Sequence, residues 1–189
     1  MISAVTVYCS SSSAVAKVYV DAAVDLGRAI ALNHWKLVYG GNSVGLMEKL
    51  ADAVRAGGGK VIGVTPQLFI DQGFHDKLCD EFIVTDCMRT RKAQMEALGD
   101  AYIAMPGGLG TFEELFEIIV GRKLGYHQKS IVLLNINRFY QPLLAMLDRA
   151  IEEKFIKPSA RELFFVADDV ASAIGHIQQY TPVESADIA

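Results

Sequence analysis

The stretch Ala101–Glu117, AYIAMPGGLGTFEELFE, constrains the fold most, because it combines a short apolar run, a glycine-rich turn and a helical pattern. The run Tyr102–Met105 is short and sharply bounded, which is typical of a buried strand. Glycines at 107, 108 and 110 let backbone N–H groups approach a ligand without an intervening Cβ. Such a turn at a helix N-terminus is typical of a phosphate site, because the first N–H groups lack intrahelical partners and the helix dipole favours an anion.

Acidic side chains at positions 113, 114 and 117 follow this turn closely. A carboxylate beside a phosphate site suggests chemistry on a phosphorylated sugar. The alternative is a capping box, in which Thr111 is the N-cap and Glu114 reaches back to its N–H. The spacing alone favours capping, and glycine-rich turns are common in α/β proteins. Both interpretations stay open on these residues alone.

Strand and helix patterns alternate along the whole chain, which predicts a doubly wound, Rossmann-like α/β fold with a parallel sheet. We expect one domain over 1–180 and a loose tail over 181–189. The expected strands are Ala4–Cys9, Lys36–Tyr39, Lys60–Val64, Glu81–Val84, Tyr102–Met105, Ser130–Leu134 and Leu163–Val166. The expected helices are Ala14–Leu32, Val44–Ala56, a short helix within Gln67–Asp80, Met88–Leu98, a helix after Thr111, Tyr140–Glu153, and a last helix that ends at about Tyr180. We expect Asn42 or Ser43 to cap the second of these helices and Asp168 or Asp169 to cap the last.

Four polar or glycine-rich segments follow predicted strands and should meet at one edge of the sheet. They are Ser10–Ser13, Gly40–Ser43, Asp86–Arg91 and Pro106–Thr111. In open α/β sheets ligands bind beyond the carboxyl ends of the strands. No G-x-G-x-x-G turn follows the first strand, so the dinucleotide fingerprint is missing.

Arg91 and Lys92 lie near the start of a predicted helix, where the helix dipole disfavours cations. This placement suggests an anionic partner, either a ligand phosphate or a carboxylate such as Glu114. A surface ion pair or two solvated charges would explain the same residues equally well.

Composition excludes several classes of function. The 189 residues carry a net charge of -4 without a basic cluster, which argues against a nucleic-acid partner. The sequence shows neither a signal peptide nor an apolar run long enough for a membrane partner. Three unpaired cysteines predict a cytoplasmic protein, and four scattered histidines predict no metal site. No lysine stands in a context that predicts a covalent cofactor.

The segments PGGLGTFEE at Pro106–Glu114 and RKAQM at Arg91–Met95 resemble the signature of the LOG (Lonely Guy) family, PGGxGTxxE with an upstream RKxxM. The similarity extends to VYCSSS, VYGGNSVGLM, GGKVIGVTP and LGYHQK, and therefore covers nearly the whole chain. The resemblance implies a phosphoribohydrolase that needs no cofactor. Such enzymes cleave cytokinin riboside 5'-monophosphates, and often AMP, to free base and ribose 5-phosphate, and they form homodimers or larger even-numbered oligomers.

The resemblance implies that Arg91 and Glu114 are catalytic, with Arg91 holding Glu114 ionised. The expected substrate contacts are Ser10, Gly41, Lys92, Gly107, Gly108, Leu109, Gly110, Thr111, Phe112 and Glu113. The chain also departs from the family pattern: Asn42 replaces a usual glycine, Ser10 stands where glycine is common, and Val120-Gly121 replaces a frequent Thr-Trp. The last change affects one substrate contact and the base preference.

Two other functions fit the fold. A nucleotide-binding carrier or sensor would use the phosphate loop without cleaving and would not need Arg91 with Glu114. The older description of this family, lysine decarboxylase, would require a pyridoxal phosphate lysine, which the residues do not indicate.

Overall fold

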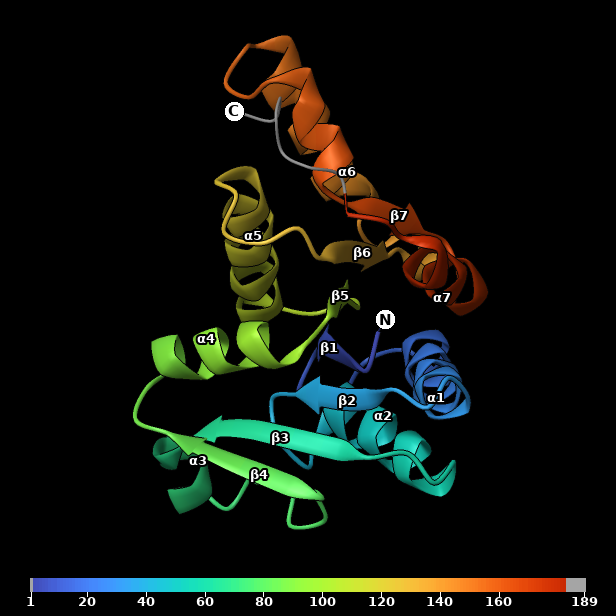
Figure 1. The fold of residues 1–189 in the computed structure, drawn as a ribbon, viewed down its shortest axis with the longest axis vertical. Helices are drawn as coiled ribbons and strands as arrows, with labels where there is room; N and C mark the ends of the chain where they lie inside the picture. Colours follow the sequence, from blue (N-terminus) through green and yellow to red (C-terminus); the bar gives the residue numbers. More distant parts are fainter. Residues whose placement is uncertain (1, 183–189) are drawn as a thin grey trace.

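The computed structural model describes residues 2–182, over which strands and helices alternate (Figure 1). In chain order the elements are β1 (Ala4–Tyr8), α1 (Lys17–Leu32), β2 (Lys36–Tyr39), α2 (Gly45–Ala56), β3 (Val61–Pro66), α3 (Gln67–Asp71), β4 (Glu81–Thr85), α4 (Met88–Leu98), β5 (Ala101–Ala104), α5 (Leu109–Lys123), β6 (Ser130–Leu134), the 3-10 turn η1 (Ile136–Arg138), α6 (Gln141–Glu152), the 3-10 turn η2 (Pro158–Leu163), β7 (Phe165–Ala167) and α7 (Val170–Gln179).

The described strands form a seven-stranded sheet in the order β4-β3-β2-β1-β5-β6-β7, and every neighbouring pair is parallel. β1 lies where the strand order reverses: Thr6 is in register with Val38 of β2 on one side and with Tyr102 of β5 on the other. This arrangement confirms the predicted doubly wound fold. The point of reversal is where such sheets open a crevice for ligands.

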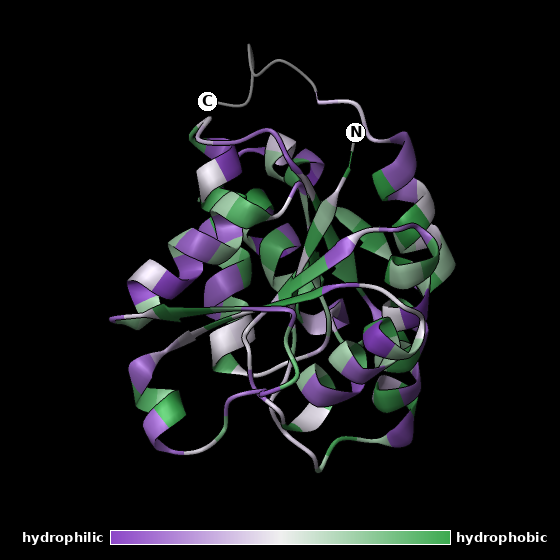
Figure 2. Ribbon diagram, turned by 60° about the horizontal axis from the view of Figure 1, so that its bottom comes forward, coloured by the Kyte–Doolittle hydropathy of each residue, from purple (hydrophilic) through white to green (hydrophobic). Residues whose placement is uncertain are grey.

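Helices cover both faces of the sheet, with α1, α2 and α7 on one face and α4, α5 and α6 on the other (Figure 1). Because side chains alternate along a strand, Val5 and Val7 enter the first core cluster while Ala4 and Tyr8 enter the second. Hydrophobic residues predominate along the central strands, whereas the surrounding helices carry both hydrophobic and hydrophilic residues (Figure 2). The buried layers fix the strand ends from which the loops project.

Several element ends differ from the expected ones. α1 begins at Lys17 and not at Ala14, because the hydroxyls of Ser10 and Ser12 accept hydrogen bonds from the N–H groups of Ser12 and Ala14 and hold this segment as a turn. Neither Asn42 nor Ser43 caps α2, whose N-cap is Val44 without a side-chain bond.

At the C-terminal end, β7 covers only Phe165–Ala167, and Leu163 belongs to a 3-10 turn. The expected Asp169 cap is confirmed, since its Oδ1 accepts a hydrogen bond from the N–H of Ser172 at 2.7 Å. The predicted tail falls mostly on residues 183–189, outside the described residues. Within residues 2–182, no helix has the length and apolar character needed to cross a membrane.

Candidate active site

The N-terminus of α5 forms one wall of the candidate site. β5 ends at Ala104, and α5 begins at Leu109 with Gly108 as its N-cap, which has no side-chain cap. Among the described residues, the N–H groups that open this helix therefore have neither an intrahelical nor a side-chain partner. A Cβ at Gly107 would collide with the side chain of Thr111, so this turn requires glycine. The helix end offers N–H donors and a positive dipole to an anion.

The capping-box alternative is wrong in this structure. Because α5 begins at Leu109, Thr111 is already inside the helix and Glu114 lies in its second turn. Glu114 therefore does not reach back to cap the helix. It is 7% exposed and points instead to a cation on α4.

That cation is Arg91, whose Nη1 donates a hydrogen bond to Glu114 Oε1 at 3.0 Å. Only 8% of each side chain is exposed, so the pair is not a surface ion pair. Arg91 Nε also donates a hydrogen bond to the carbonyl oxygen of Val64, within β3, at 3.0 Å. A Cβ at Gly40 would collide with the guanidinium, so the turn after β2 must be glycine for Arg91 to fit.

Burial raises the pKa of Glu114 to about 7, although the neighbouring Arg91 guanidinium opposes this shift. Arg91 thus favours the ionised form of Glu114, but burial leaves the carboxyl only partly ionised near neutral pH. The loss of hydration raises the pKa of Glu114 by more than the attraction of the Arg91 cation lowers it. Near neutral pH this side chain exchanges a proton readily, as a general base or acid must.

A cavity of about 430 Å³ lies beside this pair, at the carboxyl ends of the strands. It is lined by Cys9, Ser10, Ser11, Ser12, Asn42, Met47, Phe69, Met88, Arg91, Gly108, Leu109, Gly110, Thr111 and Glu114. Segments after β1, β2, β3, β4 and β5 all contribute. The structure thus brings Ser10, Arg91, Glu114 and the 108–111 segment together, as the sequence predicts.

Other predicted site residues do not line this cavity. Lys92 is 8% exposed and its Nζ pairs with Glu113 at 2.7 Å and with Glu117 at 3.0 Å. Phe112 packs against the rings of Phe139 and Tyr140 on the far side of α5.

The two remaining predicted positions, Gly41 and Gly107, shape the backbone of the turns beside the cavity. Gly41 has a positive φ of 69°, which favours glycine, and so shapes the turn after β2. Gly107 is required by its contact with Thr111. The cavity lining therefore does not include Lys92, Gly41, Gly107, Phe112 or Glu113.

Two lining residues, Met47 and Phe69, lie outside the segments expected at the site, whereas Asn42 and Met88 lie within the expected segments Gly40–Ser43 and Asp86–Arg91 but were not predicted as contacts. Asn42 and Met47 lie within the VYGGNSVGLM segment, so a signal existed for both. Phe69 carries no local signal, because an apolar side chain in a short helix predicts core. Cys9 also lines the cavity, and burial raises the pKa of its thiol, so it is neutral and a poor nucleophile.

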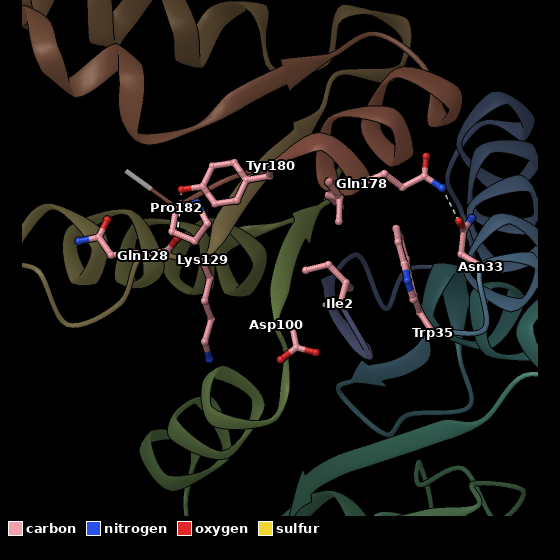
Figure 3. Close-up of a pocket in the computed structure, with 10 residues that line it drawn as sticks. Ile2, Asn33, Trp35, Asp100, Gln128, Lys129, Gln178, Tyr180 and Pro182 are labelled. Carbon is pink, nitrogen blue, oxygen red and sulfur yellow. Dashed lines mark hydrogen bonds between the residues drawn. The ribbon is translucent and has the colours of Figure 1, made fainter. Parts of the chain in front are cut away.

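Figure 3 shows a second hollow, of about 520 Å³, at the opposite edge of the sheet. Its lining residues Trp35, Asp100 and Lys129 directly precede β2, β5 and β6. Lys129 Nζ donates to the carbonyl oxygen of Glu96 at 2.6 Å, and the Asp100 carboxylate accepts from Ser3 N at 2.7 Å. These polar groups hold the fold together, and the amino edge is not where such sheets bind ligands.

This chain is similar to a described protein family and to curated enzymes. A family model described as "Possible lysine decarboxylase" matches residues 47–177. Among curated proteins, cytokinin riboside 5'-monophosphate phosphoribohydrolase LOG5 of Arabidopsis thaliana is 40% identical over 185 residues, covering 98% of this chain and 81% of the plant protein. The phosphoribohydrolase of the same description from Rhodococcoides fascians is 45% identical over 176 residues, covering 92% and 88% of the two chains.

Solved structures share the fold at lower identity. The molybdenum cofactor carrier protein of Chlamydomonas reinhardtii superposes with a TM-score of 0.72 and 25% identity, covering 95% of this chain and 98% of the carrier. Both hydrolases and a carrier are therefore similar to this chain, and the fold alone does not separate them.

Proposed function

Because this chain belongs to the family described as "Possible lysine decarboxylase", together with the cytokinin riboside 5'-monophosphate phosphoribohydrolases, we propose that it hydrolyses cytokinin riboside 5'-monophosphates and AMP. Phosphoribohydrolases cleave an N-glycosidic bond, so the chain is an N-glycosyl hydrolase. The products would be the free base and ribose 5-phosphate. The buried Arg91–Glu114 pair beside the open N-terminus of α5 is the observation that carries this proposal.

The substrate phosphate would bind the first-turn N–H groups of α5 and the hydroxyl of Thr111, which is 4% exposed and lines the cavity. Glu114 follows Thr111 by three residues, so both lie on one side of the helix. A ribose attached to that phosphate would therefore lie over Glu114. Ser10, Ser11 and Ser12, which follow β1, line the same cavity.

Cleavage breaks the bond between the anomeric carbon and the base nitrogen, and the bonding electrons leave with the base. The sugar then resembles an oxocarbenium ion, whose positive charge the Glu114 carboxylate would stabilise. Glu114 would also orient the attacking water and accept its proton, as suits a carboxyl with a pKa of about 7. The departing base takes up a proton, so one water is added across the bond. Arg91 would position Glu114 and contact the phosphate or ribose.

The two alternative functions explain less of the site. A carrier like the molybdenum cofactor carrier would use the phosphate end, but it would not need a carboxyl buried with an arginine 3.0 Å away. A lysine decarboxylase would need a lysine free to bond a cofactor. No described lysine lines the cavity, and Lys92, next to Arg91 in the sequence, forms ion pairs with Glu113 and Glu117.

We also propose that the chain forms a homodimer and works in the cytoplasm. Phe116, Val120 and Leu124 are 38%, 47% and 58% exposed and, at i, i+4 and i+8, follow one line along α5. Such an apolar line suits an interface between protein chains. Cys9, Cys79 and Cys87 are free thiols, which fits a reducing compartment.

Release of base from isopentenyladenosine 5'-monophosphate and from AMP, followed by chromatography, tests the hydrolase. Glu114→Gln should lower kcat by about 100-fold or more with little change in KM, because it removes the charge and the proton acceptor. Glu117→Gln is the matched control, since Glu117 lies on the same helix but is half-exposed and does not line the cavity. Nucleotide bound by the wild type without release of base would instead favour the carrier.

A further inference from the structure

Asn42 is the lining residue that the proposed reaction leaves unexplained. It is 8% exposed, and its Oδ1 is buried without a hydrogen-bond partner among the described residues. A buried amide oxygen without a partner destabilises a fold, and nearly all such groups are satisfied. Since Asn42 also lines the cavity, a bound ligand is the natural partner for this amide.

The backbone on both sides of Asn42 is held in place. Asp76 N donates to the carbonyl oxygen of Gly41 at 2.8 Å, and Ser43 N donates to that of Phe74 at 2.9 Å. Asn42 itself forms an isolated antiparallel bridge with His75. The amide is therefore presented from a fixed position, as a group that recognises a ligand must be.

Asn42 lies away from the phosphate end of the cavity. It follows β2, which is separated from β5 by β1 alone, so the two strand ends are about 10 Å apart at the usual strand spacing. That span matches an extended nucleoside monophosphate. The side chains of Met47, Phe69 and Met88 line the cavity with Asn42 and offer apolar and aromatic surface to a flat base.

We propose that Asn42 is a specificity-determining residue that selects 6-aminopurine nucleotides over 6-oxopurine nucleotides; this rests on the proposed function of the site. Oδ1 accepts from the N6–H of the base and Nδ2 donates to N7, the pairing that asparagine makes with adenine in DNA. A 6-oxopurine presents hydrogen-bond acceptors at both O6 and N7. The amide oxygen of Asn42 therefore faces an acceptor in either orientation of the amide. An N6-substituted adenine keeps one N6–H and still satisfies the pair.

Calorimetric titration with AMP and IMP tests this, because the two nucleotides differ at the 6-position. The parent protein carries Glu114→Gln so that nucleotide is not consumed. It should bind AMP about tenfold more tightly than IMP, because IMP leaves the buried amide oxygen unpaired. Asn42→Ala should bring the two affinities to within about threefold by weakening AMP binding. The matched control Ser43→Ala should keep the preference, since Ser43 lies outside the cavity lining.

Asn42→Ala should also keep or raise the melting temperature, because no described residue bonds Asn42 Oδ1. A drop of several degrees would assign Asn42 a structural role and overturn the proposal. Equal binding of AMP and IMP by the parent, or an unchanged ratio in Asn42→Ala and in a second variant, Asn42→Gly, would overturn it as well. If the ratio behaves as expected while the wild type releases no base, the hydrolase proposal fails and the role of Asn42 stands.

Discussion

Replacing Arg91 by methionine should raise the pKa of Glu114 further and shift the pH dependence of turnover. The two groups are 3.0 Å apart and buried, with the pKa of Glu114 at about 7 while the guanidinium is present. An arginine beside a carboxyl typically lowers the carboxyl pKa by about 1–3 units, so its removal should move Glu114 to about 8 or above. The ionised fraction at pH 7 then falls from about one half to about one tenth or less.

The assay is kcat/KM for AMP hydrolysis from pH 5 to 10. If Glu114 must be ionised to accept a proton from water, activity rises with pH through its pKa. In the wild type this rise should centre near pH 7, and in Arg91→Met about one unit or more higher. Activity at pH 7 should fall about fivefold from this ionisation alone and partly recover at pH 9.

Arg91→Lys is the matched control, since it keeps a cation beside Glu114 and should leave the rise near its wild-type position. An unshifted rise in Arg91→Met, in protein that still folds by circular dichroism, would refute the reasoning. The rise in kcat/KM with pH would then reflect the ionisation of another group, or Arg91 would not stabilise the Glu114 carboxylate.

Two further predictions concern the fold and the assembly. Gly45→Ala should destabilise the protein by about 1–3 kcal/mol in chemical denaturation, because Gly45 has a φ of 63° and a Cβ there would collide with the carbonyl of Ser11. Gly58→Ala is its control, with a φ of 75° but open space around it, and an equal loss in both variants would contradict the collision. Val120→Glu should convert the proposed dimer to monomer in size-exclusion chromatography with light scattering. A dimer that persists in Val120→Glu would place the interface elsewhere.

The fold class followed from the sequence because several strands are short apolar runs and helical patterns separate the strands. The Arg91–Glu114 contact was also expected, and the structure confirms it at 3.0 Å. The raised pKa of Glu114 was not expected. Charge partners can be recognised in a sequence, whereas the depth to which a carboxyl is buried depends on how α4 and α5 pack against the sheet. Phe112 was grouped with the phosphate loop by adjacency, yet one step along a helix turns a side chain by about 100°, towards Phe139.

The base end of the cavity was the least predictable part. Phe69 reaches the cavity from α3, a five-residue helix that buries no residue of its own, so no hydrophobic pattern marks it. Asn42 was expected at this edge of the sheet, as a possible helix cap and as a departure from a family pattern, but not as a base contact. Its unpaired amide oxygen depends on how the turn after β2 is held by the segment around His75.

The sheet order also dictates how the chain can assemble during synthesis. Strands β1 to β4 leave the ribosome in the order in which they lie from the centre of the sheet to one edge, and β5 to β7 then extend the sheet from β1 to the other edge. Until residue 104 has emerged, β1 has an unpaired edge, which is a site for pairing with other nascent chains. A chain arrested before α5 would carry Arg91 without Glu114, so the carboxylate of the proposed active site is the last of its two charged groups to be made.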